Sequence, residues 1–312
     1  MTTRTTTAST KTSDAVTPHD AQSASRGAVA PDDAQSASRE PVAVKAERLH
    51  ELLAGYRSVL IAFSGGVDSA YLAIAAHQAL GDRALAITAD SPSYPETHRR
   101  LAHSIARDFG FAHEMIRTAE LERPEYRANP ANRCYYCKDE LYSQLAAIAR
   151  ARDFAVVIDG NNADDRGDYR PGRQAAREHG VRSPLDEADL TKDDIRALAR
   201  AAGLASWDEP ASACLSSRIP YGQEVTDERL RQIEQAEQVL RDLGFRIFRV
   251  RHHDTVARLE IARAEMPRAL DPEINARLVS SLKALGYRYV SLDLQGYRLG
   301  SLNEALRLRP VS

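Results

Sequence analysis

The chain has 312 residues, 43% of them hydrophobic, so it can bury a sizeable core, and its length favours two domains. Its 42 Lys and Arg nearly balance its 44 Asp and Glu, and this balance gives no whole-chain reason to expect a nucleic-acid partner. Because no apolar run approaches a membrane span and no signal-peptide core follows Met1, we expect a cytoplasmic protein with no membrane partner.

Residues 1 to 44 are rich in Ala, Ser, Thr and Asp and contain the segment DAQSASR twice, at 20–26 and 33–39. Such composition offers little apolar surface to bury, so we expect a disordered tail and exclude it from the fold. The rest divides by pattern into a domain at 45–205 and a smaller one at 206–312.

A glycine-rich stretch, SGGVDS, follows the apolar run 59–63 and precedes a helical pattern at 70–80. Backbone N–H groups in such a turn approach a phosphate closely, and hydroxyl groups and the helix dipole favour the anion. The stretch resembles the pyrophosphate-binding (PP) loop of the ATP pyrophosphatases and lacks the Walker lysine. We therefore expect an ATP site, with an ordinary small-residue turn as the alternative. Its residues here are Ser64, Gly65, Gly66, Asp68 and Ser69.

Apolar runs alternate with helical patterns through the first domain, which predicts βαβ units on a parallel sheet. The runs are 59–63, 84–89, 111–116 and 154–158, and the helical patterns are 69–80, 96–109 and 138–152. Ligands in such sheets lie beyond the carboxyl ends of the strands. Asp90, Ser91 and the segment 159–161 follow two further strands, so we expect them near the glycine-rich loop. Asp68, with Asp164 or Asp165, is a candidate to bind Mg²⁺ on the ATP phosphates; a capping role is the alternative for the latter two.

The second domain is predicted to be α+β, with helices at 226–243 and 272–285 and strands at 245–251, 256–261 and 287–294. Arg249 and Arg251 alternate on one strand face and Arg298 follows a Gly-Tyr turn. Their planar guanidinium groups suit a substrate phosphate, although a solvated strand face also explains the strand pair. Glu234, Glu237 and Glu260 are weaker metal candidates, and solubility of a helix surface explains the first two better.

Three cysteines are too few and odd in number for a disulfide framework and favour metal ligands or reactive thiols. Cys134 and Cys137 form a CxxC just before the helical pattern at 138–152; a redox disulfide or inert thiols remain alternatives. Cys214 could add a third ligand, and Arg218 would favour its thiolate and a catalytic role. The alternative for Cys214 is a small core residue.

Several separated segments together resemble the LarE family of ATP-dependent sulfur transferases of nickel-pincer nucleotide cofactor synthesis. They are 132–138 (NRCYYCK), 160–165 (GNNADD) with 168–172 (DYRPG), 213–222 (ACLSSRIPYG) and 296–303 (GYRLGSLN). The similarity runs from about residue 44 to 306. It implies a PP-loop (adenine nucleotide alpha hydrolase-like) α/β domain followed by the smaller α+β domain.

The resemblance implies that ATP adenylates a carboxylate of pyridinium-3,5-biscarboxylic acid mononucleotide and that sulfur then makes it a thiocarboxylate. Cys214 matches the family's sulfur-bearing cysteine, which some members sacrifice in a single turnover. Members that also have a CxxC are thought to hold a 4Fe-4S cluster on three cysteines, which implies Cys134, Cys137 and Cys214 as its ligands and a sulfide donor as partner. We also expect a homo-oligomer.

Two other functions fit part of the sequence. A PP-loop tRNA thiolase would also use a CxxC, but the near-neutral charge and the lack of a Lys/Arg-rich platform disfavour RNA. A non-catalytic nucleotide sensor would need the loop alone and would leave Cys214 and Arg218 unexplained.

Overall fold

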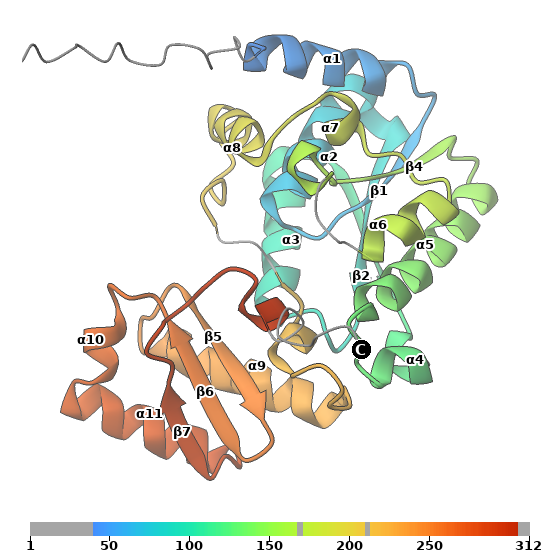
Figure 1. Ribbon diagram of the computed structural model, residues 1–312. Coiled ribbons are helices and arrows are strands. Elements are labelled where there is room, and N and C mark those ends of the chain that lie inside the picture. The colour runs from blue at the N-terminus through green and yellow to red at the C-terminus, as the bar shows by residue number, and fades with distance from the viewer. Residues whose placement is uncertain (1–39, 167–170, 210–212, 305–312) are drawn as a thin grey trace, which may run out of the picture. The chain divides into compact units, whose positions relative to one another are not determined.

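Two sheets organise the residues that the computed structural model describes, which are 40–166, 171–209 and 213–304 (Figure 1). The expected disordered tail lies outside the described residues up to position 39, as does most of the motif at 168–172. The end of the expected tail is helical, since the first helix already begins at Val42. None of the helices among the described residues has the length and apolar character that a membrane crossing requires.

The first part of the chain alternates strands and helices as the apolar pattern predicts. Its elements are α1 Val42–Ala54, β1 Val59–Ala62, α2 Val67–Leu80, η1 Gly81–Arg83, β2 Ala84–Asp90, α3 Glu96–Phe109, β3 Ala112–Arg117, η2 Glu120–Glu122, α4 Pro124–Arg127, α5 Arg133–Ala151, β4 Val156–Asp159, η3 Ala163–Asp165, α6 Pro171–Glu178, α7 Pro184–Glu187 and α8 Lys192–Ala201.

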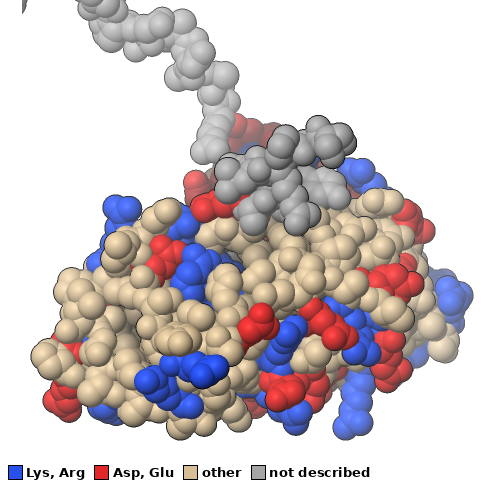
Figure 2. Space-filling view, turned by 60° about the horizontal axis from the view of Figure 1, so that its bottom comes forward, with Lys and Arg blue, Asp and Glu red and all other residues tan. Residues whose placement is uncertain are grey.

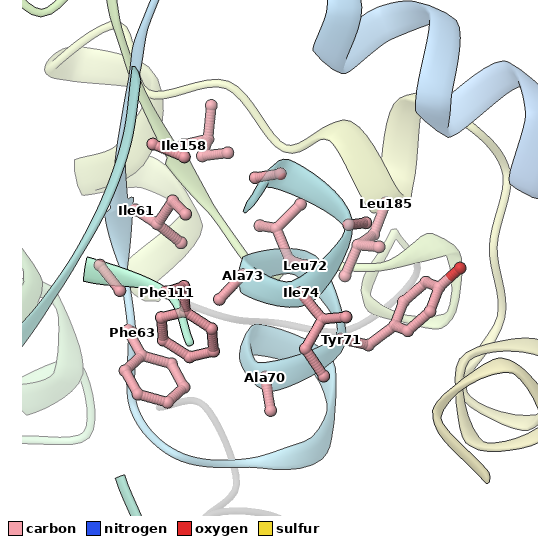
Figure 3. Close-up of a cluster of buried hydrophobic side chains, with 14 of the residues drawn as sticks. Ile61, Phe63, Ala70, Tyr71, Leu72, Ala73, Ile74, Phe111, Ile158 and Leu185 are labelled. Atoms are coloured by element: carbon pink, nitrogen blue, oxygen red, sulfur yellow. The ribbon is translucent and has the colours of Figure 1, made fainter. Parts of the chain in front are cut away.

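The first sheet is parallel throughout, with strand order β3-β2-β1-β4. Side chains of β1 alternate between its faces: Ile61 joins the core under α2, and Leu60 joins the core under α5 and α6. Figure 3 shows Ile61 and Ile158 on the strands facing Leu72 and Ala73 of α2. Both faces are therefore covered by helices, and the α/β prediction is confirmed.

The second part of the chain forms a smaller sheet with helices. Its elements are η4 Leu215–Arg218, α9 Asp227–Asp242, β5 Phe248–His253, β6 Val256–Ile261, α10 Met266–Ala269, α11 Pro272–Ala284, β7 Tyr289–Leu292 and η5 Ser301–Asn303. The order is β5-β6-β7, with β6 antiparallel to β5 and parallel to β7. Residues of α9 and α11 share one core with this sheet. The α+β prediction is confirmed for this sheet, and the boundary at residue 205 stays a prediction.

Two sequence expectations differ from the structure at strand ends. The strand expected from residue 245 begins at Phe248, because Phe245 instead packs into the core from the turn after α9. The strand expected over 287–294 is only Tyr289–Leu292, and Tyr287 before it is buried against the same core. In both segments the first apolar residue is buried, but it lies outside the hydrogen-bonded strand.

Candidate active site

The glycine-rich loop joins β1 to α2 and presents backbone donors at the carboxyl edge of the sheet. Gly65 has a φ of +71°, a conformation that other residues rarely adopt, and the α2 N-cap Gly66 has no side chain that could cap the helix. The hydroxyls of Ser64 and Ser69 lie 3.1 Å apart, and the Ser69 hydroxyl is 3.0 Å from the Gly66 carbonyl. Uncapped N–H groups, hydroxyls and the helix dipole together make a cradle for an anion.

Asp68 lies in the first turn of α2 beside this loop. Its Oδ2 accepts a hydrogen bond of 3.1 Å from Asn162, whereas its buried Oδ1 has no hydrogen-bond partner among the described residues. The pKa of Asp68 is raised to about 6, first by burial and also by Asp165, against the lowering effect of Lys192. An oxygen atom placed in this way suits a divalent cation that also binds phosphate oxygens.

The other predicted strand-end residues are held by protein contacts. Arg99 donates to the Asp90 carboxylate at 2.5 Å and to the Ser91 carbonyl at 3.0 Å. The Ser91 hydroxyl lies 2.9 Å from that of Ser93. Asp164 is exposed, and its Oδ2 accepts from the backbone N–H of Lys192 at 2.8 Å. The roles of these residues in cofactor binding stay predictions.

Asp165 has the capping role that the sequence left open. The side chains of Asn162 and Asp165 form a capping box on η3, and the Asp165 carboxylate lies 3.5 Å from the Lys192 ammonium. The preceding Gly160 is tightly packed, because a Cβ there would lie 3.0 Å from the Ser69 backbone nitrogen. This turn after β4 therefore seats directly against the first turn of α2.

Cys134 and Cys137 lie inside the first turns of α5, which begins at Arg133 and not after the CxxC as expected. The spacing i, i+3 places both on one side of the helix. Cys137 packs against a buried cluster that includes Tyr126, Leu215 and Ile219, so the segment carrying Cys214 lies against this end of α5.

Buried polar contacts fix the Cys214 segment to the CxxC helix. Arg133 donates to the Ser216 carbonyl at 3.0 Å, and the hydroxyls of Tyr126 and Ser216 are 2.6 Å apart. Asn129 donates to the carbonyls of Pro220 and Gln223 at 2.8 and 2.9 Å. These contacts are what bring residues distant in sequence together.

The three thiols influence one another electrostatically. Cys134 is exposed as a whole residue, yet desolvation of its sulfur and then the charge of Cys214 raise its pKa, whereas Arg133 and Lys138 lower it. Burial raises the pKa of Cys137 well above its usual range, with Glu120 and Cys214 adding to the effect. Within the described ranges, no group of three or more His, Cys, Asp or Glu side chains is arranged to hold a metal ion.

Arg218 and Glu237 form a buried ion pair with two hydrogen bonds, of 2.8 and 3.0 Å. Arg218 also donates to the carbonyls of Ala213 and Cys214 at 2.7 and 2.9 Å. The expectation that Glu237 serves helix-surface solubility is wrong, because Glu237 is only 1% exposed and holds the arginine that ties the Cys214 segment to α9. The catalytic role of Arg218 stays a prediction.

The three predicted phosphate-binding arginines are all engaged by protein groups. Arg251 is buried, pairs with Glu260 at 2.8 Å and donates to the Ser217 carbonyl at 2.6 Å, which brings β5 to the Cys214 segment. Arg249 lies over the Tyr297 ring, and Arg298 pairs with Glu304 at 3.1 Å. Their role toward a substrate stays a prediction.

A short connection after β2, residues 91–94, contacts both the glycine-rich loop and the segment that carries Cys214. After β2, the Ser93 carbonyl accepts a 2.8 Å hydrogen bond from the N–H of Leu215, the residue after Cys214. The Ser93 hydroxyl donates to the buried Glu120 at 3.0 Å, and the Tyr94 hydroxyl donates to the Ser64 carbonyl at 2.9 Å. Sequence reasoning missed Glu120, Asn129 and Arg133; only Arg133 carried a signal, its place beside the CxxC.

Charge on the surface gives no sign of a broad cationic platform on the face that Figure 2 draws. Lys and Arg side chains there lie in small groups among Asp and Glu. This agrees with the near balance of charges in the sequence.

The chain is similar to known proteins over nearly the whole length of those proteins. No protein-family model matches the chain. The chain is 39% identical over 266 residues to the pyridinium-3,5-bisthiocarboxylic acid mononucleotide synthase of Lactiplantibacillus plantarum, a match that covers 85% of this chain and 96% of that protein. It is also similar to an uncharacterised protein of Synechocystis, at 44% identity over 84% of this chain and 98% of the relative. An uncharacterised protein of Methanocaldococcus jannaschii is 27% identical over 78% of this chain and 91% of its own length.

Proposed function

The chain belongs to the LarE family, that of pyridinium-3,5-bisthiocarboxylic acid mononucleotide synthase, and from this premise we propose that it is an ATP-dependent sulfur transferase. Its substrate is pyridinium-3,5-biscarboxylic acid mononucleotide. ATP adenylates a carboxylate and releases pyrophosphate; sulfur then attacks the activated carbonyl carbon, and AMP leaves as the thiocarboxylate forms.

The observation that carries this proposal is the connection 91–94, which contacts both the glycine-rich loop and the Cys214 segment. Through Tyr94 it holds the Ser64 carbonyl, and through Ser93 it holds the backbone next to Cys214. Residues 91–94 therefore hold the proposed adenylating site and the proposed sulfur site close to each other. Such proximity suits a reaction in which sulfur must attack the activated carboxyl group before water hydrolyses it.

The loop supports the use of ATP with Mg²⁺. The uncapped start of α2, with Ser64, Gly65, Gly66 and Ser69, suits the phosphates, and the unpartnered Oδ1 of Asp68 suits the metal ion. A Mg²⁺ ion held by Asp68 would supply positive charge beside the departing pyrophosphate.

The cysteine pocket supports a 4Fe-4S cluster on Cys134, Cys137 and Cys214. This support rests on the packing of the Cys214 segment against the end of α5 that carries the CxxC, because in the described structure the three side chains are not themselves arranged around a metal ion. Each ligand of such a cluster binds a different iron, so three thiolates leave one iron open. When bound, the cluster would supply sulfide at that iron, and Asn129 and Arg133 would keep the Cys214 segment in place.

The arginines of the second sheet support binding of the substrate's phosphate. Burial, and after it the charges of Arg218, Arg241 and Arg249, lower the pKa of His98 to about 4, so these arginines lie near α3. Planar guanidinium donors suit a phosphate monoester.

Mass spectrometry of the products tests the proposal. The purified full chain, given ATP, Mg²⁺, the dicarboxylate mononucleotide and sulfide without oxygen, should release pyrophosphate only when the mononucleotide is present. The product should gain the mass of an oxygen-to-sulfur exchange. Pyrophosphate release without thiocarboxylate, or neither product, would overturn it.

A further inference from the structure

Arg133 is a buried cation without an acidic partner. It is only 3% exposed, and among the described residues no Asp or Glu forms an ion pair with it. The other buried arginines beside the pocket differ, because Arg218 pairs with Glu237 and Arg251 pairs with Glu260. Burial of an unpaired charge is unfavourable in general, so this position favours an anionic ligand.

Arg133 makes its hydrogen bonds to oxygen through one end of its guanidinium, and its side chain also bonds the Cys134 thiol. Both of its bonds to oxygen, to the Ser216 carbonyl and to Asn129 Oδ1, use Nη1. Within the described part of the chain, Nε and Nη2 donate to no oxygen. Those two nitrogens present parallel N–H groups, the fork that binds the two oxygens of a carboxylate at once.

The cysteines lie close to Arg133, because Cys134 follows it in α5 and the Arg133 Nη1 bonds the Ser216 carbonyl, two residues after Cys214. The Tyr221 ring centre lies 6.0 Å from the guanidinium carbon, so an aromatic side chain borders the same space. A planar anion bound at this edge would therefore lie beside both cysteines.

We propose that the Nε–Nη2 edge of Arg133 binds a carboxylate of an aromatic dicarboxylate substrate and holds it against the sulfur of the pocket. This inference rests on the proposed function, in which a pyridinium dicarboxylate meets sulfur here. Arg133 is then a substrate-binding residue for the carboxylate end, separate from the phosphate-binding arginines of the second sheet.

Alkylation of Cys214 with a charged and a neutral reagent tests the edge directly. The full chain, without ATP or iron, is treated with iodoacetate or iodoacetamide, and peptide mass spectrometry gives the rate at Cys214 for each. The rate ratio cancels changes in thiol accessibility, so a structural role would not move it. We expect Arg133→Gln to lower the iodoacetate-to-iodoacetamide ratio about tenfold, as loss of a charge-assisted contact implies.

Arg123→Gln is the matched control. Arg123 also contacts α5, through the Tyr136 carbonyl, but Asp139 pairs with it at 2.7 Å, so its loss should leave the ratio within about twofold. An unchanged ratio in Arg133→Gln, or an equal fall in Arg123→Gln, would overturn the proposal.

Protection by a substrate fragment distinguishes a carboxylate site from a general positive charge. Pyridine-3,5-dicarboxylate should slow the iodoacetamide reaction of Cys214 in the unmodified protein, and the uncharged diamide should not. Arg133→Lys keeps the charge without the fork, so it should fold normally and lose most of this protection. Equal protection in the lysine variant would contradict the fork. Since no ATP is used, these results stand whether or not the adenylation reaction occurs.

Discussion

At the scale of single residues, Asp68 combines an unfavourable environment with a predicted function. Its raised folded pKa of about 6 means that the folded chain binds more protons than the unfolded chain between about pH 4 and 6. Stability is therefore highest below the unfolded pKa and falls as the pH rises through 6. Functional residues commonly carry such a penalty.

The substitution Asp68→Asn separates the cost of Asp68 to stability from its predicted role in binding the metal ion. Without ATP and Mg²⁺ at pH 8, we expect a free energy of unfolding about 3 kcal/mol higher than in the unmodified protein, from about 1.4 kcal/mol per pKa unit. At pH 4 the two proteins should match. Pyrophosphate release should fall by at least about a hundredfold, since the metal contact supplies several kcal/mol of transition-state stabilisation. Near-normal release would refute the metal role.

The pKa of Glu237 is shifted in the opposite direction from that of Asp68. Burial would raise its pKa, but Arg218, Arg249 and Arg241 lower it below its usual range, so the carboxylate contributes stability above about pH 4.5 that is lost on acidification. Glu237→Gln leaves Arg218 buried without a partner and should lower the free energy of unfolding at pH 7 by about 3–5 kcal/mol.

Glu234→Gln on the same helix is the control for this prediction. Glu234 accepts a 2.6 Å hydrogen bond from the Glu96 N–H near the surface, and its loss should change stability by no more than about 1 kcal/mol. Urea unfolding measures both variants. Equal effects would mean that the Arg218–Glu237 pair does not anchor the Cys214 segment.

At the scale of elements, the seating of the β4–η3 turn on α2 has a measurable consequence. In Gly160→Ala the new Cβ would lie 3.0 Å from the backbone of Ser69, so one of the two turns must shift. We expect a loss of about 1–3 kcal/mol in stability, as for other overpacked sites, and at least a tenfold weaker ATP affinity.

The control is Gly55→Ala, because Gly55 has a helical φ of −69° and a Cβ there would be no closer than 3.4 Å to other atoms. Calorimetric titration with a non-hydrolysable ATP analogue compares the two variants. If Gly160→Ala binds the analogue as tightly as Gly55→Ala, the β4–η3 turn does not support the glycine-rich loop.

The strands and helices around the loop were predictable because period and turn chemistry agree there. The strand before Ser64 lies within the predicted run, and the helix predicted from residue 69 begins at Val67, two residues earlier. The start of α5 was not predictable in the same way. Its first turns, with Arg133 and both cysteines, lack an apolar period of their own, and Arg133 is held by Asn129 and by the distant Ser216.

The site residues likewise fall into two groups: those with a local sequence motif and those that only the fold brings to the site. Motif residues such as Ser64, Asp68 and Cys214 could be selected from local spacing. The burial of Glu237 could not, because α9 is strongly polar and Arg218, its partner, lies in a distant segment. Glu120 had no local signal either, since only the fold places it beside Ser93 and near Cys137.

At the scale of the whole molecule, the connection 91–94 contacts both the glycine-rich loop and the segment that carries Cys214. If the cysteines act as one centre, Cys134→Ala and Cys137→Ala should each remove most of the iron bound after anaerobic reconstitution. Cys134→Ala should leave the free energy of unfolding of the iron-free chain within about 1 kcal/mol, since an exposed site tolerates truncation. Full iron binding in either variant would contradict a shared centre.

The most direct test of sulfur insertion by these cysteines is the number of thiocarboxylate groups formed per protein molecule. The reconstituted chain is supplied without oxygen with excess ATP, Mg²⁺, dicarboxylate mononucleotide and sulfide, and the product is counted by mass spectrometry. We expect more than one thiocarboxylate per protein, an unchanged mass at Cys214 and a fall to one or fewer in Cys134→Ala. A single turnover with loss of sulfur from Cys214, unaffected by Cys134→Ala or Cys137→Ala, would contradict the account.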